Sequence, residues 1–295
     1  QPDIIIPDSV VMPRTECRTT ANGVKIYILD SEDFEVVRFS FIFRAGTSMQ
    51  HKPFTASATV NMISEGSHSK TAQEIAEMLD FYGSNYDANI DRDYAYLSFV
   101  SLSKFFDKTA EVAEEIILHP SFNNKELQIY CSKRKQGLAI ERKKIDVQSR
   151  ELFGKALFGE EHPYGKTSPE REYDNITRDD LVALYNELYT ANNCFIVCSG
   201  RVTESVLRTI EDIASKIAQG RARGVEFPAP TVTHRIFKED DTALLSSIRI
   251  GRLLFERKHP DFVGMQVVAT TLGGYFGSRL MQNLREEHGY TYGVM

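Results

Sequence analysis

Apolar and polar positions in the first 120 residues follow two periods, which predict strands and helices in mixed order. Residues 24–28 and 36–43 are rich in β-branched and aromatic side chains and alternate with polar positions, as strands do. The acidic stretch 30–33 between them is typical of a turn, so we expect the two strands to form a hairpin. From Thr71 to Gly83, apolar residues recur at spacings of three and four, which predicts a helix with an apolar face of Ile75, Met78, Leu79 and Tyr82.

The alternation of strands and helices continues to about residue 220. Hairpins and helices in mixed order favour an α+β fold, in which helices are layered on a mainly antiparallel sheet, over a doubly wound parallel sheet. The expected elements are a strand at 94–100, a helix at 106–117 ending near Pro120, a long polar helix from about Asn124 to beyond Lys144, a helix that begins at Thr177 with Asp180 three residues later, a buried strand at 194–198 and a helix from Thr203 to Gly220.

A change in composition near residue 220 predicts the end of one compact unit. The stretch from Gln219 to Thr233 gathers glycines and prolines among basic and polar residues, as linkers do. We therefore expect a first α+β domain over residues 1–222, a linker over 223–233, and an incomplete second α+β domain of the same type over 234–295. Within the second domain we expect a strand at Ile248 and Ile250, helices at 261–272 and 278–284, and the start of a strand at 290–294.

Composition and charge narrow the class of protein. Of the 295 residues, 42% are hydrophobic and 26% are charged, which suffices for a complete hydrophobic core. A formal charge of −6 disfavours nucleic acid as a partner. The sequence has no transmembrane segment and no signal-like start, so we expect a soluble protein, cytoplasmic or periplasmic. Because the chain begins at Gln1 rather than Met, we expect a segment to have preceded it.

Common catalytic motifs are absent from the sequence. No two of the seven histidines lie one helical turn apart, and the sequence has neither a nucleophile elbow nor a phosphate-binding loop with a Lys-Ser/Thr ending. The four cysteines lack metal-binding or redox spacing, so we expect them to be reduced. One pair of residues is a candidate for substrate binding. Arg285 on a helix and Tyr292 in a following strand could bind a substrate carbonyl, the first through its charge and the second through a hydrogen bond from its hydroxyl.

Several short strings stand in register along the chain; each is common by itself, but together they are specific. The strings are Ala45-Gly46-Thr47-Ser48, Glu65-Gly66-Ser67, Ala72-Gln73-Glu74-Ile75-Ala76, Ala88 to Asp93, His162-Pro163-Tyr164-Gly165, Ile176 to Leu181, Tyr189 to Asn193, Leu272-Gly273-Gly274, Ser278-Arg279-Leu280 and Leu284 to Tyr292. Together they resemble the pitrilysin and mitochondrial-processing-peptidase family of inverted-motif zinc peptidases. The resemblance implies that family's α+β half-subunit fold, followed by part of a second homologous unit.

The chain departs from this family at the zinc site. Family enzymes carry H-x-x-E-H, in which two histidines bind zinc and the glutamate serves as the base. Registered on Glu65-Gly66-Ser67, the motif falls on Ser57, Val60 and Asn61, and the family's third ligand, a glutamate, falls on Gly137. Hydroxyl, amide and methyl groups cannot replace an imidazole pair and a carboxylate. We therefore expect no cofactor in this chain and zinc only on a partner subunit.

What remains of the family's site points to a role beside another chain. In paired family members one subunit supplies zinc, and the second-half arginine and tyrosine of the other, here Arg285 and Tyr292, bind the substrate in trans. The resemblance thus implies a non-catalytic subunit that completes the chamber and peptide site of a zinc-bearing homologue. Two alternatives stay open: a structural or assembly protein without peptide turnover, and an active hydrolase with an unconventional metal site. An exposed sheet edge could also hold an extended peptide by strand addition.

Overall fold

The computed structural model describes residues 13–31, 33–220, 226–241 and 243–294. The chain divides into two compact units, residues 1–248 and 249–295. The domain limits expected from composition stay a prediction.

A six-stranded sheet forms the centre of the first unit. Its strands run in the order β1-β2-β6-β3-β5-β4, and every neighbouring pair is antiparallel except β2 and β6, which are parallel. The expected α+β fold with a mainly antiparallel sheet is therefore confirmed. The strands are β1 Glu16–Thr19, β2 Lys25–Asp30, β3 Val36–Phe43, β4 Asn85–Ile90, β5 Ala95–Leu102 and β6 Cys194–Gly200.

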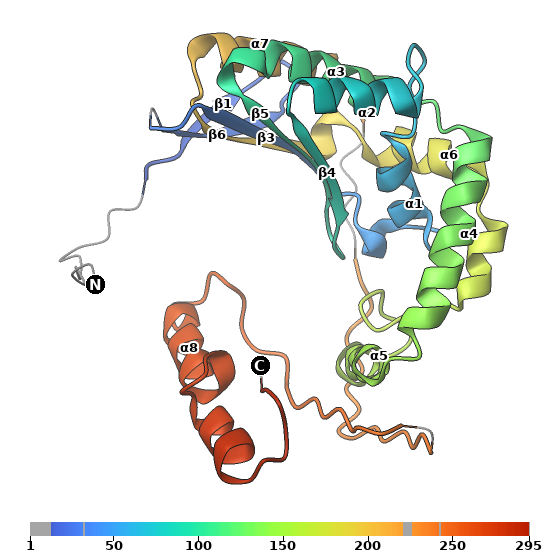
Figure 1. Ribbon diagram of the computed structural model, residues 1–295, viewed down its shortest axis with the longest axis vertical. Coiled ribbons are helices and arrows are strands. Elements are labelled where there is room, and N and C mark those ends of the chain that lie inside the picture. The colour runs from blue at the N-terminus through green and yellow to red at the C-terminus, as the bar shows by residue number, and fades with distance from the viewer. Residues whose placement is uncertain (1–12, 32, 221–225, 242, 295) are drawn as a thin grey trace. The chain divides into compact units, whose positions relative to one another are not determined.

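Helices cover one face of this sheet. Figure 1 shows α2, α3 and α7 on the same side of it. The helices are α1 Thr55–Met62, α2 Ala72–Phe81, α3 Phe106–Leu118, α4 Asn124–Glu141, α5 Ile145–Phe158, α6 Arg178–Leu188 and α7 Glu204–Lys216, with short 3₁₀ turns at Thr47–Met49, Ser103–Phe105, Glu170–Asn175 and Ala191–Asn193.

The hydrophobic core lies between these helices and β3. Phe39, Phe41 and Phe43 point to the helical side and are fully buried. Phe39 stacks on Phe99 of β5, with ring centroids 5.0 Å apart. The opposite face is less covered, because its residues, such as Tyr27 and Val197, are only half-buried. The sheet therefore has one face sealed by helices and one partly accessible face.

The predicted hairpin between the second and third strands is wrong. Strand β6, about 150 residues later in the chain, lies between them: Cys198 is paired with Ile28 on one side and with Phe39 on the other. Strand β2 instead forms its hairpin with β1, a short polar strand that periodicity missed. Pairing followed burial of apolar side chains on the helical face rather than proximity in sequence.

The long polar helix predicted from residue 124 to beyond 144 is interrupted. Helix α4 ends at Glu141, and α5 begins at Ile145. Lys144 adopts an extended conformation at the break. The guanidinium of Arg142 lies 2.9 Å from the Glu151 carboxylate and 3.4 Å from that of Glu170, which holds the chain in this turn.

The second unit contains helices but no strand among its described residues. Helix α8 spans Phe262–Ala269 and continues as a π-helical segment at Thr270–Gly274; a second π-helical segment spans Met281–Glu287. These confirm the two predicted helical regions. The strands expected at Ile248 to Ile250 and after Gly289 are wrong, because a strand forms only with a partner for its backbone, and the described chain offers none there.

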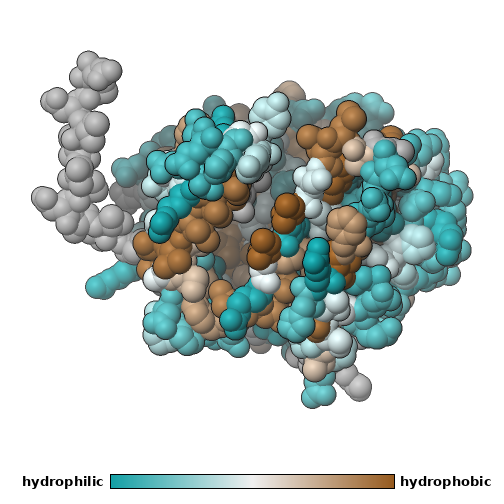
Figure 2. Space-filling model, turned by 90° about the horizontal axis from the view of Figure 1, so that it is seen from below, coloured by the Kyte–Doolittle hydropathy of each residue, from teal (hydrophilic) through white to brown (hydrophobic). Residues whose placement is uncertain are grey.

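Large apolar side chains remain at the surface of the second unit. They include Val263, Val267 and Val268 of α8, none of whose residues is buried. Figure 2 shows hydrophobic patches among hydrophilic side chains on the side of the molecule seen from below. Within the described residues, no helix is long and apolar enough to cross a bilayer.

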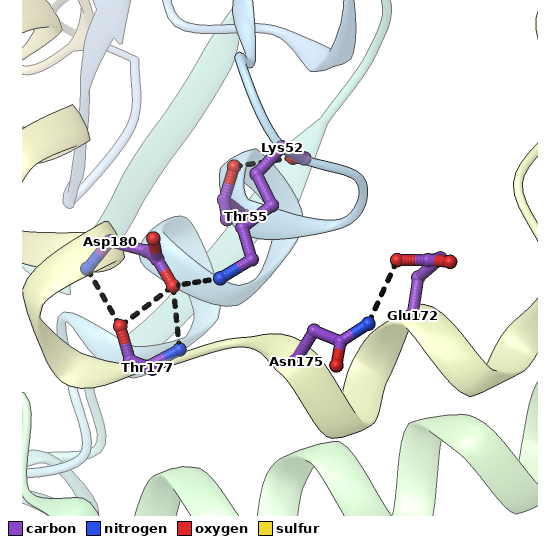
Figure 3. A network of polar contacts seen from close by, with 6 residues as sticks. All are labelled: Lys52, Thr55, Glu172, Asn175, Thr177 and Asp180. Carbon is purple, nitrogen blue, oxygen red and sulfur yellow. Dashed lines mark hydrogen bonds and ion pairs between the residues drawn. The ribbon is translucent and has the colours of Figure 1, made fainter.

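A partly buried network of hydrogen bonds joins the segment before α1 to the start of α6 (Figure 3). The Lys52 ammonium donates to the Asp180 carboxylate at 2.6 Å, and the same oxygen accepts from the Thr177 hydroxyl at 2.7 Å. Thr177 and Asp180 form the capping box expected from sequence. Burial by itself raises the pKa of Asp180, but hydrogen bonds from Lys52 and Thr177 outweigh it and hold the pKa below its ordinary value.

Replacing Lys52 by methionine is expected to lower the free energy of unfolding at neutral pH by about 1 kcal/mol, because Asp180 loses a charged hydrogen bond. The folded-state pKa of Asp180 lies below its unfolded value, so this stabilisation is complete above about pH 4 and is lost as the pH falls through the folded pKa. Denaturant unfolding at neutral and at acid pH measures it. Replacing exposed Lys166 in the same way is the control; a loss that persists undiminished in acid contradicts the assignment.

Candidate functional site

Helix α1 carries Ser57, Val60 and Asn61, the three positions on which we predict that the zinc motif falls. The Ser57 hydroxyl donates to the Phe54 carbonyl at 2.9 Å, and the Asn61 amide donates to the Ser57 carbonyl at 2.8 Å. Val60 is fully buried in the core. The polar groups of this helix are thus bonded to its own backbone, an arrangement common for serine and asparagine in helices.

Helix α4 carries the fourth position. A Cβ added at Gly137 would meet nothing within 4 Å, so this point of the helix faces open space. Closer to α1, the Tyr130 hydroxyl is buried near Ser57, and burial raises the pKa of Tyr130 to about 12. A neutral phenol of α4 therefore lies beside a hydroxyl of α1.

These residues do not fit a catalytic zinc ion. Zinc in hydrolases takes imidazole and carboxylate or thiolate ligands and keeps an open position for water. Over the described part of the chain, no three histidine, cysteine, aspartate or glutamate side chains lie close enough together to hold a metal. No step of hydrolysis can therefore be assigned to α1 and α4 of this chain.

The scaffold around α1 is nevertheless firmly built. Phe54, immediately before the helix, has a positive φ of 64°, an unusual conformation for a bulky residue. Its ring stacks on Tyr173 with centroids 4.2 Å apart and planes nearly parallel. Together with the Lys52–Asp180 contact, this stack fixes where α1 begins. The position of the helix is maintained although its ligands are missing.

A second cluster forms at the turn between β4 and β5. Three backbone N–H groups of the Gly46 turn donate to carbonyls of Asp91, Arg92 and Asp93, at 2.8 to 3.1 Å. A Cβ at Gly46 would collide with the backbone of Arg92 and Asp93, so only glycine permits this close approach. Two of the strings that carry the family resemblance therefore meet at this turn.

Arg92 joins a third string to the same turn. Its guanidinium donates to the Tyr164 carbonyl and lies 5.1 Å from the centroid of the Tyr164 ring and 5.8 Å from that of Phe158. Gly154, the buried residue of α5, leaves room for the Arg92 side chain, because a Cβ added at Gly154 would lie 3.6 Å from the Arg92 guanidinium. Periodicity could not identify this cluster, although its residues stand in the resembling strings.

Burial shifts the pKa values of two groups in this cluster. We name it the Arg92 cluster: Asp91, Arg92, Asp93, Phe158, His162 and Tyr164. Burial raises the pKa of Tyr164 to about 12, and its hydrogen bond to Asp93 adds to the effect. The His162 ring is buried, and its Nδ1 accepts from the Tyr164 N–H at 3.0 Å. Burial and the nearby Arg92 charge lower the pKa of His162, which is neutral at pH 7.

The two residues predicted to act in trans lie in the second unit. The Arg285 guanidinium lies 4.4 Å from the Phe276 ring centroid and 3.4 Å from the Glu286 carboxylate. Tyr292 is 91% exposed. No contact between Arg285 and Tyr292 is found in the described part of this unit. Both side chains are accessible, and their proposed role in substrate binding stays a prediction.

Family models match two parts of the chain. Residues 55–157 match the model described as insulinase, peptidase family M16, and residues 175–295 match the peptidase M16 inactive domain. The first match includes the degenerate α1 and α4 positions, and the second includes Arg285 and Tyr292. The two halves of the chain are therefore similar to the two different domain types of one peptidase family.

Curated relatives match nearly the whole chain at low identity. An uncharacterized zinc protease of Bacillus subtilis, YmxG, is 24% identical over 94% of this chain and 68% of its own length. A Helicobacter pylori protein named a non-peptidase homolog is 20% identical over 92% of this chain and 65% of its own length. A probable mitochondrial-processing peptidase subunit beta of Schizosaccharomyces pombe is 20% identical over 90% of this chain and 60% of its own length.

A solved structure shows the same fold. The crystal structure of a peptidase M16 inactive domain from Pseudomonas fluorescens matches with a TM-score of 0.82 and 23% identity, covering 95% of this chain and 69% of that one. Pitrilysin matches with a TM-score of 0.66 and 15% identity, covering 75% of this chain and 24% of that one. The architecture is thus that of an M16 half-unit.

Replacing Gly137 by alanine is expected to raise the free energy of unfolding by about 0.5–1 kcal/mol, because alanine is the better helix former and its methyl group meets no atom. Gly154 on α5 is the matched control: there a Cβ would lie 3.2 Å from the Tyr164 carbonyl oxygen, so alanine is expected to destabilise. Denaturant unfolding measures both. If Gly137→Ala instead lowers the stability, the space next to Gly137 on the surface of α4 must be occupied.

The purified chain is expected to bind far less than one zinc ion per molecule, because its four motif positions hold no zinc ligand. Metal analysis after incubation with excess zinc and gel filtration measures the stoichiometry. A zinc peptidase with an intact H-x-x-E-H motif, treated identically, is the control. Stoichiometric zinc in this chain would revive the interpretation as a hydrolase with an unconventional metal site.

Proposed function

Because the chain belongs to peptidase family M16, we propose that it is a non-catalytic subunit that completes the chamber and peptide site of a zinc-bearing homologue. One observation carries this proposal: helix α1 is held in place by Lys52 and Phe54, yet the ligand positions on α1 and α4 are Ser57, Asn61 and Gly137. A scaffold maintained without its metal ligands suits a role in which the structure, rather than the ion, is needed.

The similar proteins agree with one part of this proposal, namely that the chain is a non-catalytic member of the family. The second half of the chain matches the family's inactive domain, and one relative is named a non-peptidase homolog. Other relatives are named zinc proteases, so the names alone do not determine the activity. The family's half-unit fold supports pairing with a homologous unit, which in our proposal provides the zinc.

The edge of the sheet offers a means of holding a peptide. Strand β4 is the last strand in the sheet order, so its outer backbone groups have no strand neighbour within the described residues. Its side chains alternate between exposed and half-buried, and Asn85, Asp87 and Asn89 are the exposed ones. An extended peptide could add to this edge through main-chain hydrogen bonds, which recognise any sequence.

Arg285 and Tyr292 provide the chemistry in this proposal. A guanidinium and a phenol are both hydrogen-bond donors, and donors aimed at a carbonyl oxygen stabilise the negative charge that develops during hydrolysis. Their contribution requires zinc and its activated water on the partner chain. The half-buried face of the sheet, including Tyr27 and Val197, would form part of the chamber wall.

Replacing Arg285 by alanine in a complex with a zinc-bearing M16 chain is expected to lower kcat/KM for an unstructured peptide about 100- to 1000-fold, the usual cost of removing one transition-state donor. Fluorogenic peptide cleavage measures the change. The control is Arg252→Ala, which removes an exposed arginine of the same unit and should leave the rate unchanged.

Three other outcomes would count against the proposal. Full activity of the Arg285 variant would mean that Arg285 does not bind the substrate at the partner's active site. A stable complex that neither binds nor cleaves peptide would favour an assembly protein. Turnover by the isolated chain would favour an unconventional hydrolase.

A further inference from the structure

The segment after residue 225 is attached to helix α5. We name residues 226–241 the strap; Figure 1 shows it, in orange, beside α5. The Thr231 N–H donates to the Phe158 carbonyl at 3.2 Å, and the Thr233 N–H donates to the Ala156 carbonyl at 2.7 Å. Further along, the Lys238 ammonium donates to the Gln148 side chain at 2.6 Å. The strap therefore follows the helix from its end back to its first turns.

These hydrogen bonds have a clear physical basis. The last four carbonyls of an α-helix have no partner within the helix, and Ala156 and Phe158 are among them in α5. The strap provides two of the missing donors. Gly159 allows the approach, because its φ is +82° and an added Cβ would lie 3.1 Å from that of Thr231.

Little of the strap is buried. Apart from Phe227, which is half-buried, its described residues are exposed, with Ala229 and Phe237 as examples. A cavity of about 390 Å³ lies between the strap and the loop at 159–162. A segment with few buried contacts opens at low free energy, so the strap can detach while the domain stays folded.

Phe227 connects the strap to the Arg92 cluster. Its ring centroid lies 5.4 Å from that of His162 and 5.6 Å from that of Tyr164. Tyr164 in turn accepts a hydrogen bond from Arg92 at its carbonyl and donates one to Asp93 through its hydroxyl. An unbroken set of contacts therefore runs from the strap to the turn that ends strand β4.

We infer that the strap is a releasable latch that regulates the β4 edge. With Phe227 in place, Tyr164 and Arg92 are fixed and the turn between β4 and β5 is ordered. Release of the strap frees the Tyr164 ring, loosens this turn and weakens binding of an extended peptide to β4. The binding part of this inference rests on the proposed function, whereas the coupling between strap and turn does not.

Hydrogen exchange of the full chain tests the coupling without a peptide. Phe227→Ala is expected to speed exchange at least tenfold (about 1.4 kcal/mol) both in residues 229–234 and in residues 85–94, while β3 is unchanged. The control is Phe237→Ala, because Phe237 belongs to the same strap but is 76% exposed. Faster exchange in the strap alone would overturn the coupling, and unchanged exchange in both regions would overturn the latch.

A second variant separates release of the strap from a local effect on Tyr164. Thr233→Pro removes the N–H that donates to Ala156 and leaves the Arg92 cluster untouched. A latch predicts the same faster exchange in residues 85–94 as for Phe227→Ala. No change there would mean that Phe227 acts only through its own ring contacts, which contradicts the latch.

Peptide binding distinguishes failure of this inference from failure of the proposed function. An unstructured fluorescent peptide is expected to bind the wild-type chain in its zinc-bearing complex and to bind the Phe227 variant at least tenfold more weakly. Equal binding by both proteins overturns the regulation alone. Absence of binding by the wild type overturns the peptide-holding function, while the exchange data still decide the latch.

Discussion

Burial of the aromatic face of β3 is the constraint on which the rest of the structure depends. Phe39, Phe41 and Phe43 all lie on one side of a central strand, and three large rings leave water only if helices cover them. The flanking strands β5 and β6 extend the same apolar face, because Phe99 and Cys198 are paired with Phe39. Strand β4 is one of the two outer strands of the sheet, and helices α1 and α4 are located beyond it.

Helix α1 is held in place by residues other than those at its predicted zinc-motif positions. The contacts that place α1 are outside the motif: an ammonium on a carboxylate at Asp180 and a ring stack on Tyr173. The motif positions on α1 contribute packing at Val60 and hydrogen bonds to the helix backbone at Ser57 and Asn61. Contacts at its start therefore hold α1 in place.

The Arg92 cluster has a different kind of importance. It joins the end of β4 to the loop after α5, and its partners come from segments that are far apart in the chain. The Arg92 guanidinium lies against the rings of Phe158 and Tyr164, and glycine at positions 46 and 154 leaves room for the close approach of these segments. In our inference, movement of the loop after α5 would reach the β4 edge through these contacts.

The sequence by itself determined features that depend on neighbouring residues. The apolar faces of α2, α3 and α7, the capping box at Thr177, and the lack of histidine and carboxylate at the predicted zinc-motif positions can all be read along a single stretch of chain. The fold class followed from the mixture of these elements, and the family resemblance added the identity of the site positions.

Only the tertiary structure decided which distant segments meet. The insertion of β6 between β2 and β3, the break after Glu141 and the contacts of Arg92 with Tyr164 each depend on partners tens to more than a hundred residues away. Strands at Ile248 and Tyr290 failed for the same reason, because alternation provides a suitable face but not the backbone partner. Periodicity indicates whether a segment favours a helix or a strand. Which strands pair is decided by the burial of apolar side chains from the whole chain.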